Sequence, residues 1–575
     1  MPPSTQIITH LIYEDLFKTV PKGGIVLPVE ALRGEGIIDV VIADLIKDFD
    51  PIEALCYSAF LNMTCQAGMN QEKLLELNRK ELKVLGPSMH PSSNKLLWHR
   101  DNLLYFISEI LRLRVHGDKN ITGNRNIRHA QNYYKVLMLI NSKINRVSGD
   151  RKHVILKDCF MRDYPYYYAP EISSQIFSRR IQRYQYIYKK LLENVESSRK
   201  DKLCEAVGNF EKKTGVSLED YFYALKEIFA WFLQFPLLRE SKPNQVFTSF
   251  GFDHLKIKSF YITRSNFKKD PGFIATVEHL SSDIDQMVHA IESERRDSIE
   301  GFYECFQIFF DHPIFRINKD EFCIIDLRFL LGGVCEGFFW HLKELSETKI
   351  QEFKGQYGYL IEHYFDFLMR NIFPAIKITR GEAGAPDAIL ETNDHIIVFE
   401  FTTEYYRFAS LYNTGIQGVL DDLHRLLFKS GGDDLIGRGK TDRGKFLKMN
   451  DYIERYKSSP KKIIPILVTE GYVGDYDLLN QFDGFLDASI EEKGLTNLSI
   501  FRPLVINLDD LETFWALSTP ASSVDKFFEF VASWKLASKG PFHYNFTYFM
   551  ADQSGGKVEN EEYKKFFNFK KDLTR

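Results

Sequence analysis

The stretch that most constrains the fold of this chain is Ala385–Glu404, APDAILETNDHIIVFEFTTE. Within it, Ala388–Glu391 is a short extended run, and Ile396–Phe401 is a β-branched and aromatic run of the kind found in strands. Between them, Thr392–His395 carries the Asn-Asp pair typical of a tight turn. The pattern predicts a β-hairpin, around which the rest of the chain is organised.

Two acidic residues lie at matching ends of this hairpin. Asp387 precedes the first strand, and Glu400 lies near the end of the second. Because side chains in a strand alternate between faces, Glu400 and Thr402 project to the same side. Two carboxylates at one end of a sheet form a hard-oxygen site suited to Mg²⁺, with the backbone carbonyl of Phe401 as a further oxygen ligand. Such a metal activates a bound water and offsets the charge of a phosphate.

The order Pro386-Asp387, twelve residues, then Glu400-Phe401-Thr402 resembles the PD-(D/E)XK nuclease superfamily, the fold of many restriction enzymes and RecB-type nucleases. Upstream, Gly358-Tyr359-Leu360-Ile361-Glu362 lies on an amphipathic run and is similar to the helix motif G-x-x-F/Y-E of that family. The resemblance implies DNA cleavage with Mg²⁺, for which Mn²⁺ substitutes. It also implies that Glu362 helps Asp387 and Glu400 to bind the metal.

Thr402 stands where the family has a lysine, which orients the attacking water and stabilises negative charge. The run Glu400-Phe401-Thr402-Thr403 is similar to the E-x-T-T of AlwI-like type IIS restriction and nicking endonucleases. Thr402 can position a water, but its hydroxyl carries no charge. We therefore expect a cation from the following helix, Ile416–Lys429, with three candidates: His424, Arg425 and Lys429. By resemblance to RecB-like nucleases, Gln417 contacts the metal-bound water or DNA.

Composition narrows the class of protein. The chain has 575 residues, which suggests about two to four domains. A net charge of −4 means that any DNA-binding surface must be a local basic patch. The seven cysteines are scattered without a C-x-x-C pair, which favours reduced thiols in a cytoplasmic protein. No signal peptide and no membrane span are recognisable.

The expected fold class is an α/β C-terminal nuclease core, a restriction-endonuclease-like mixed sheet flanked by helices, with a large mainly α-helical N-terminal region. Residues 1–245 form the helical region, and residues 246–350 form a connector that packs on the core. Residues 351–575 form the nuclease-like domain, with further strands at Ala375–Thr379, Lys462–Thr469 and Phe501–Leu508 and a basic, Gly-rich insertion at 429–462.

In the connector, Phe322–Phe329 is expected to be a strand and Gly332–Leu345 one helix with Trp340 buried. Asp326 is expected to be a structural carboxylate rather than a catalytic one.

Two basic segments are candidates for nucleic-acid binding, because Arg and Lys neutralise phosphates and tyrosines stack on bases. In the first, basic residues alternate with tyrosines: Arg179, Arg180, Arg183 and Lys189. The alternative there is a solvated helix face whose aromatics serve the core. The second lies in the insertion: Arg438, Lys440, Arg443 and Lys445. Its alternative is a surface excursion without a binding role.

These features predict a Mg²⁺-dependent DNA endonuclease of restriction or anti-phage defence. Since one active site cuts one strand, double-strand cleavage would require a homodimer or a partner subunit. Two alternatives stay open. One is a catalytically silent nuclease fold that binds DNA or acts as a scaffold, and the other is an RNA-cleaving nuclease of an abortive-infection system.

Overall fold

We describe the chain from a computed structural model. The residues that it describes are 25–26, 45–46, 49–66, 95–96, 100–114, 133–137, 139–140, 170–233, 261–265, 270–296, 306–335, 337–380, 382, 385–403, 422, 449, 451–456, 458–471, 490–491, 493–495, 500, 504–520, 523–537, 546–555 and 558–567. The protein is a mixed α/β protein. The largest sheet that the described residues form has five strands, and a second, mixed sheet has four.

The five-stranded sheet is mixed in direction. Its hairpin pairs with a short antiparallel strand on one side and with two parallel strands on the other. Across the sheet the order is β11 (Leu504–Asn507), β10 (Lys462–Thr469), β9 (His395–Thr402), β8 (Ala388–Glu391) and β7 (Lys377–Ile378). The predicted hairpin and the three further strands are therefore present. In this topology the carboxyl ends of β9, β10 and β11 meet the amino end of β8 at one edge.

A long helix, α20 (Ile350–Ile372), covers one face of this sheet. Its apolar residues recur every three or four positions and are buried, as the sequence pattern predicts. The ring of Phe365 stacks on that of Phe401 of β9 with centroids 5.0 Å apart. Phe399 and Phe401 thus face α20, and because side chains alternate, Glu400 and Thr402 belong to the other face.

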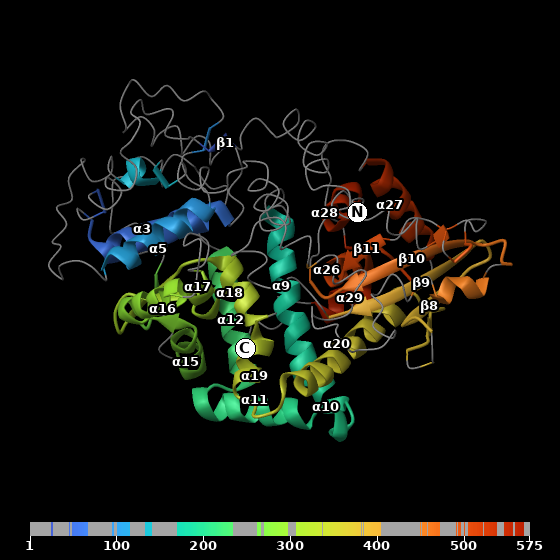
Figure 1. Cartoon of the computed structure of the whole chain (residues 1–575), viewed down its shortest axis with the longest axis horizontal. Coiled ribbons are helices and arrows are strands. Elements are labelled where there is room, and N and C mark those ends of the chain that lie inside the picture. Colours follow the sequence, from blue (N-terminus) through green and yellow to red (C-terminus); the bar gives the residue numbers. More distant parts are fainter. Residues whose placement is uncertain are drawn as a thin grey trace.

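The helix α26 (Leu508–Leu517) follows β11 without a loop. Asn507 caps it, since its side chain accepts the N–H of Asp510 and its own N–H donates to the Asp510 carboxylate. All ten residues of α26 are buried, polar ones included. The C-terminal helices α27 (Ser523–Ala537), α28 (Phe546–Gln553) and α29 (Glu561–Phe566) lie near it (Figure 1).

The described residues of the N-terminal half are mainly helical, as expected. The first two long helices among them are α3 (Pro51–Gln66) and α5 (Arg100–Arg114). The remaining helices are α9 (Pro170–Tyr186), the π-helical turn η4 (Ile187–Leu191), α10 (Leu192–Asn194), α11 (Asp201–Thr214) and α12 (Leu218–Leu233). Lys95–Leu96 forms a short strand, β2, paired with β1 (Ile25–Val26).

The connector contains the four-stranded sheet of β3 (Ile262–Thr263), β6 (Glu321–Ile324), β5 (Ile314–Arg316) and β4 (Ser281–Ser282). Its helices are α15 (Pro271–His279), α16 (Ile284–Arg296), α17 (Gln307–Asp311), α18 (Leu327–Val334) and α19 (Phe338–Glu344). The prediction of a strand over Phe322–Phe329 was wrong beyond Ile324, because Asp326 caps α18 by accepting the Phe329 N–H at 2.8 Å. Asp326 is structural, as expected, since it also pairs with Arg100.

The single helix predicted over Gly332–Leu345 is interrupted. It is divided between α18 and α19, and the glycines at the break pack against Phe310. A Cβ on Gly333 would meet the backbone carbonyl oxygen of Phe310. The expectation that Trp340 is buried was also wrong: this residue is 45% exposed.

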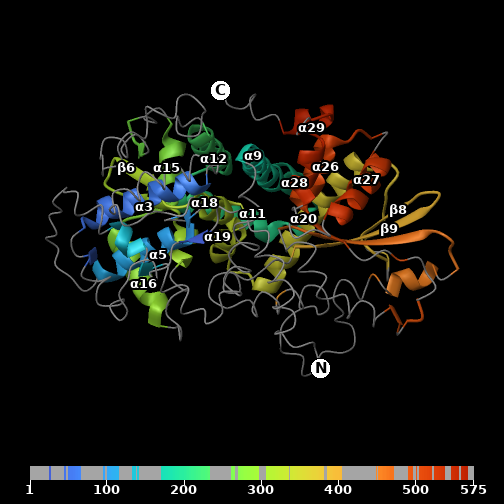
Figure 2. The same cartoon turned by 90° about the horizontal axis from the view of Figure 1, so that it is seen from above.

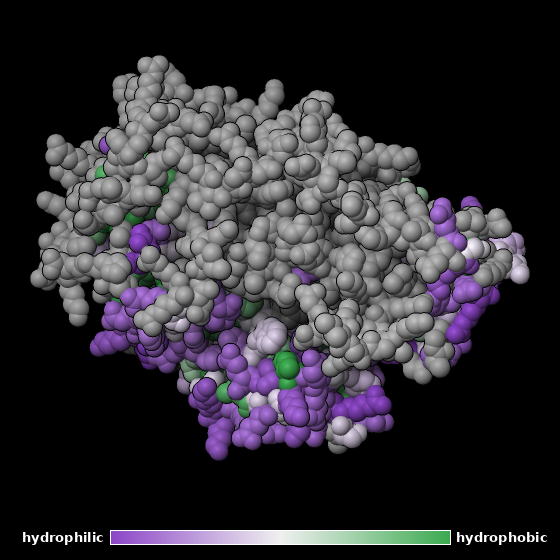
Figure 3. Space-filling model, viewed as in Figure 1, coloured by the Kyte–Doolittle hydropathy of each residue, from purple (hydrophilic) through white to green (hydrophobic). Residues whose placement is uncertain are grey.

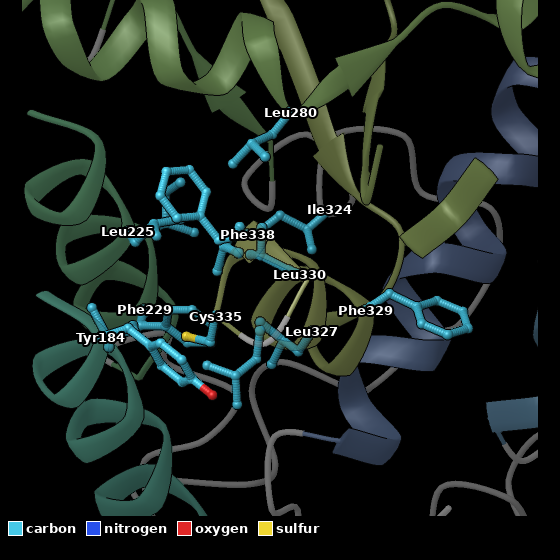
Figure 4. Packing of buried hydrophobic residues seen from close by; sticks show 14 of the residues in the cluster. Tyr184, Leu225, Phe229, Leu280, Ile324, Leu327, Phe329, Leu330, Cys335 and Phe338 are labelled. Carbon is cyan, nitrogen blue, oxygen red and sulfur yellow. The ribbon is translucent and has the colours of Figure 1, made fainter. Parts of the chain in front are cut away.

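One continuous apolar core joins the helical half, the connector and the sheet. Figure 4 shows side chains of α9, α12, β6, α18 and α19 meeting in it. In both Figure 1 and Figure 2, α9 lies between the sheet with its neighbouring helices, such as α26 and α27, and the group of helices that includes α3, α5, α15 and α16. The surface that Figure 3 shows over α10 and α11 is mostly hydrophilic. Among the described helices, none has the length and apolar character needed to cross a membrane.

Candidate active site

The candidate active site lies where β8 begins and β9 ends. Ala388 and Phe399 form the last pair of the antiparallel register, and the Asp387 N–H donates to the Phe399 carbonyl. Asp387 precedes Ala388 and Glu400 follows Phe399, so both acids lie at the same end of the hairpin. Glu400 belongs to the sheet face away from α20, whereas the Asp387 carboxylate meets Arg380, which also contacts α20. Like charges at one end of a strand pair repel. This arrangement therefore favours a cation.

The backbone and side chain of Asp387 are fixed by four contacts. Its N–H donates to the Phe399 carbonyl and its carbonyl accepts the Thr379 N–H, both at 3.0 Å. One carboxylate oxygen, Oδ2, accepts the Phe401 N–H at 2.7 Å. The other, Oδ1, faces Nε of Arg380 at 3.3 Å. Asp387 thus terminates the hairpin ladder as well as contributing charge to the site.

Arg380 connects Asp387 to the acidic residues of α20. Its Nε lies 3.4 Å from Oε2 of Glu362, and its Nη1 lies 2.9 Å from Oδ1 of Asp366. Nη1 also donates to the backbone carbonyl of Glu362 at 3.0 Å. The carboxylates of Glu362 and Asp387 therefore contact the same nitrogen atom. Burial raises the pKa of Asp366, and Arg380 opposes that shift.

Glu400 and Thr402 are each only 6% exposed. In the parallel register with β10, Glu400 pairs with Leu467 and Thr402 with Thr469. Glu470, directly after β10, donates its N–H to the Thr402 carbonyl at 3.1 Å and so holds the end of β9.

Glu470 is a buried carboxylate that the sequence reasoning missed. Its Oε1 accepts the hydroxyl of Tyr184 at 2.6 Å and that of Tyr357. The sequence does contain a signal for Glu470, because this residue follows the apolar run KIIPILVT just as Glu400 follows the apolar run of the hairpin. Arg380 was missed as well, and no motif marks it.

Further polar groups of α20 adjoin the Arg380 contacts. The rings of Tyr359 and His363 are in contact, with centroids 4.5 Å apart, and Arg199 lies over the Tyr359 ring at 4.6 Å. Burial lowers the pKa of His363; Asp366 opposes the shift, while Arg380 and Arg199 add to it. This side chain is therefore neutral at pH 7.

The residues fit a divalent cation in part. Among the residues that the structure describes, no three His, Cys, Asp or Glu side chains form a metal-binding group. Glu362 is held by Arg380 rather than joined directly to the two hairpin acids. The pair Asp387 and Glu400, with the Phe401 carbonyl, has the hard-oxygen chemistry that Mg²⁺ prefers. The candidate donors are thus two carboxylates and a carbonyl, and Glu362 is connected to Asp387 through Arg380.

The first predicted nucleic-acid patch needs correction. Arg179, Arg180 and Arg183 are 5%, 6% and 1% exposed and face carboxylates instead of solvent. Arg180 and Arg183 pair with Asp509 and Glu512 of α26, and Arg179 donates to Thr513. Burial alone would raise the pKa of Asp509, but Arg180 and Arg183 hold it well below its usual range. These arginines stabilise the fold and offer no surface to phosphates.

Lys189 is 36% exposed in its side chain and pairs with Glu219 at 2.8 Å. Eight further predicted residues lie outside the part of the chain that the structure describes: Gln417, His424, Arg425, Lys429, Arg438, Lys440, Arg443 and Lys445. At the end of the insertion, Met449, Tyr452 and Ile453 are described and buried, so that end belongs to the folded core.

Comparison with known proteins adds no relative: no family model, no curated protein and no solved structure matches the chain. The functional reading depends on the site alone.

Proposed function

We propose that this protein is a metal-dependent endonuclease that hydrolyses DNA phosphodiester bonds, a cytoplasmic enzyme of restriction or anti-phage defence. The observation that carries the proposal is the position of Asp387 and Glu400 at the same end of an antiparallel strand pair in a mixed sheet. Two carboxylates at one end of a sheet are hard-oxygen donors of the kind that Mg²⁺ prefers. The order of helix, antiparallel strands and parallel strands agrees with the nuclease resemblance of the sequence.

Asp387, Glu400 and the Phe401 carbonyl would hold Mg²⁺ or Mn²⁺. When bound, such a metal lowers the pKa of a water ligand and compensates phosphate charge. Glu362 contributes negative charge from α20. Thr402, on the same strand face as Glu400, offers a hydroxyl that orients a water but brings no positive charge. Arg380 contacts Asp387, and its guanidinium supplies the positive charge that the Thr402 hydroxyl lacks.

The test is cleavage of supercoiled plasmid DNA during Mg²⁺ titration, with wild type, Asp387→Asn and Glu400→Gln. Both variants keep the size of the side chain and remove its charge. The matched control is Glu391→Gln, at the opposite end of β8, where Glu391 is exposed and pairs with Lys461. We expect Mg²⁺-dependent cleavage by wild type and control, and a loss of at least 100-fold in the two site variants.

The products separate the remaining questions. Nicked plasmid alone indicates a monomer that cuts one strand, whereas linear plasmid indicates a homodimer or a partner subunit. Cleavage of RNA but not DNA would assign the site to an RNA-cleaving abortive-infection nuclease. If folded wild type cleaves neither substrate at any Mg²⁺ or Mn²⁺ concentration, the endonuclease proposal is wrong.

One observation favours a second candidate, a catalytically silent nuclease fold that binds DNA or acts as a scaffold. Arg380 already neutralises part of the charge of Asp387 and Glu362, so a metal is not needed to hold them together. This candidate predicts DNA binding in a gel-shift assay that is independent of Mg²⁺ and unchanged in Asp387→Asn.

A further inference from the structure

The guanidinium of Arg380 makes unequal contacts along its two edges. Nη1 is anchored on α20, at 2.9 Å from Asp366 and 3.0 Å from the Glu362 carbonyl. Nε makes only longer contacts, at 3.3 Å to Asp387 and 3.4 Å to the Glu362 carboxylate. Nη2 is buried and has no hydrogen-bond partner among the described residues.

The edge formed by Nε and Nη2 is the one that arginines of this protein use for close bidentate pairs. Arg100 donates from Nε and Nη2 to the two carboxylate oxygens of Asp326 at 2.7 and 3.2 Å, and Arg183 does the same to Glu512 at 2.6 and 2.9 Å. In Arg380 that edge is poorly satisfied. A phosphate, like a carboxylate, offers two oxygens that match such an edge.

Arg380 is shared by several acidic groups. The carboxylates of Glu362, Asp366 and Asp387 all contact it, and Arg370 is a second positive group near Asp366. The side chain of Arg380 is 18% exposed and lies over the Phe365 ring at 5.7 Å, so solvent screens the cluster only in part. The cluster therefore attracts further positive charge, and the long Nε contacts are the ones that a competing cation breaks first.

We propose that Arg380 is the resting counter-ion of this acidic cluster, that a divalent cation displaces its Nε from Asp387, and that the freed Nε–Nη2 edge then binds a phosphodiester of the nucleic acid. Arg380 stays anchored through Nη1 on Asp366 and the Glu362 carbonyl. The phosphate contact rests on the proposed nuclease function, whereas the competition with a cation does not. Arg380 is thus a residue of the site that alternates between two anionic partners.

The competition is tested by Mn²⁺ binding to the full chain, measured by electron paramagnetic resonance without DNA. Arg380→Met removes the competing charge, so we expect the Kd for Mn²⁺ to fall by about three- to tenfold, about 0.7–1.4 kcal/mol. The control Lys377→Met loses the same charge three residues away, at a side chain that is 68% exposed and pairs with Glu382, and should leave the Kd unchanged. Adding Asp387→Asn should cancel the gain.

A merely structural Arg380 would give the opposite result, because disorder of the cluster weakens Mn²⁺ binding. An unchanged or higher Kd in folded Arg380→Met overturns the proposal. If that variant does not fold, wild type is tested instead by nuclear magnetic resonance. The Arg380 Nε–H resonance is assigned by its loss in Arg380→Lys, and we expect it to shift during Mg²⁺ titration. A resonance that does not move overturns the proposal as well.

The phosphate contact is tested by fluorescence anisotropy of a DNA duplex in Ca²⁺. We expect Arg380→Met to bind DNA at least tenfold more weakly than Lys377→Met, and equal affinities would overturn this step. The outcomes separate the two hypotheses. If Arg380→Met lowers the Kd for Mn²⁺ but wild type does not cleave DNA, the counter-ion proposal stands and the nuclease proposal is wrong. If wild type cleaves DNA but Arg380→Met does not lower that Kd, the nuclease proposal stands and the counter-ion proposal is wrong.

Discussion

Arg183 of α9 donates from Nε to Oε1 of Glu512 of α26 at 2.6 Å, and both side chains are buried. The same Glu512 oxygen accepts the hydroxyl of Tyr364 of α20 at 2.7 Å. Burial alone would lower the pKa of Arg183, but Glu512 and Asp509 raise it well above its usual value, so the guanidinium stays charged. This contact joins a helix of the N-terminal half to the helix that follows the last strand of the sheet.

Removing Arg183 should therefore destabilise the whole protein. Arg183→Met leaves the Glu512 charge buried, and breaking such a pair costs about 3–5 kcal/mol. Adding Glu512→Gln should restore part of the loss. The exposed Lys189→Met, which breaks the pair with Glu219, should change the free energy of unfolding by less than about 1 kcal/mol. Urea denaturation followed by circular dichroism measures all three, and an Arg183→Met loss no larger than that of Lys189→Met would contradict the expectation.

Two glycine-to-alanine substitutions should change the folding stability in opposite directions. Gly333→Ala places a Cβ against the Phe310 carbonyl, and overpacking of that kind costs about 1–3 kcal/mol. Gly355→Ala, in the middle of α20, meets nothing within 4 Å and should stabilise the helix by about 0.5–1 kcal/mol. Thermal denaturation distinguishes them: the Tm should fall for Gly333→Ala and rise for Gly355→Ala. Equal shifts would mean that the break between α18 and α19 does not depend on this contact.

The elements around the site were predictable because their signals are local. The hairpin, α20 and β10 each carry their own period or turn within a single run of residues. Alternation along β9 also placed Glu400 on one face without any tertiary information. The break between α18 and α19 was not predictable, since Phe310, which requires the glycines there, lies in another helix.

The charged residues were predictable only where their partners were near in sequence. Arg179, Arg180 and Arg183 have the spacing of a basic surface, and their carboxylate partners lie more than 300 residues further on. The role of Arg380 was likewise not predictable, because it depends on contacts with both α20 and Asp387. The contributions of Gln417, His424 and the basic residues of the insertion stay predictions.

Histidines at the junction of α15 and α19 should make stability depend on pH. The pKa of His279 and that of His341 are both lowered to about 4. Burial is the main cause, and neighbouring histidines, His312 among them, contribute to the shift. The unfolded chain then binds more protons than the folded one between about pH 4 and 6.5, so stability falls as pH falls through that window. Asp311 has the opposite slope, because burial raises its pKa to about 6 and protonation stabilises its folded form.

A variant isolates the histidine contribution from that of Asp311. His341→Gln removes one titrating group, so its unfolding free energy should depend less on pH than that of wild type. The difference should be at most about 1.4 kcal/mol per pH unit between pH 6.5 and 4.5. Urea titrations at four pH values measure it. Identical slopes for the two proteins would show that His341 does not titrate in the folded state as its burial requires.

The structural and chemical roles of Asp387 should separate by choice of substitution. Its Oδ2 accepts the Phe401 N–H, and Phe401 is buried. Asp387→Ala leaves that donor without a partner, which costs about 1–3 kcal/mol, whereas Asp387→Asn keeps an acceptor oxygen in place. We expect Asp387→Ala to unfold at lower urea than Asp387→Asn, and both to lack Mg²⁺-dependent cleavage. Glu391→Ala, at the other end of β8, should match wild type in both assays. Cleavage by folded Asp387→Asn at the wild-type rate would show that the carboxylate serves the hairpin alone and that the reaction does not use its charge.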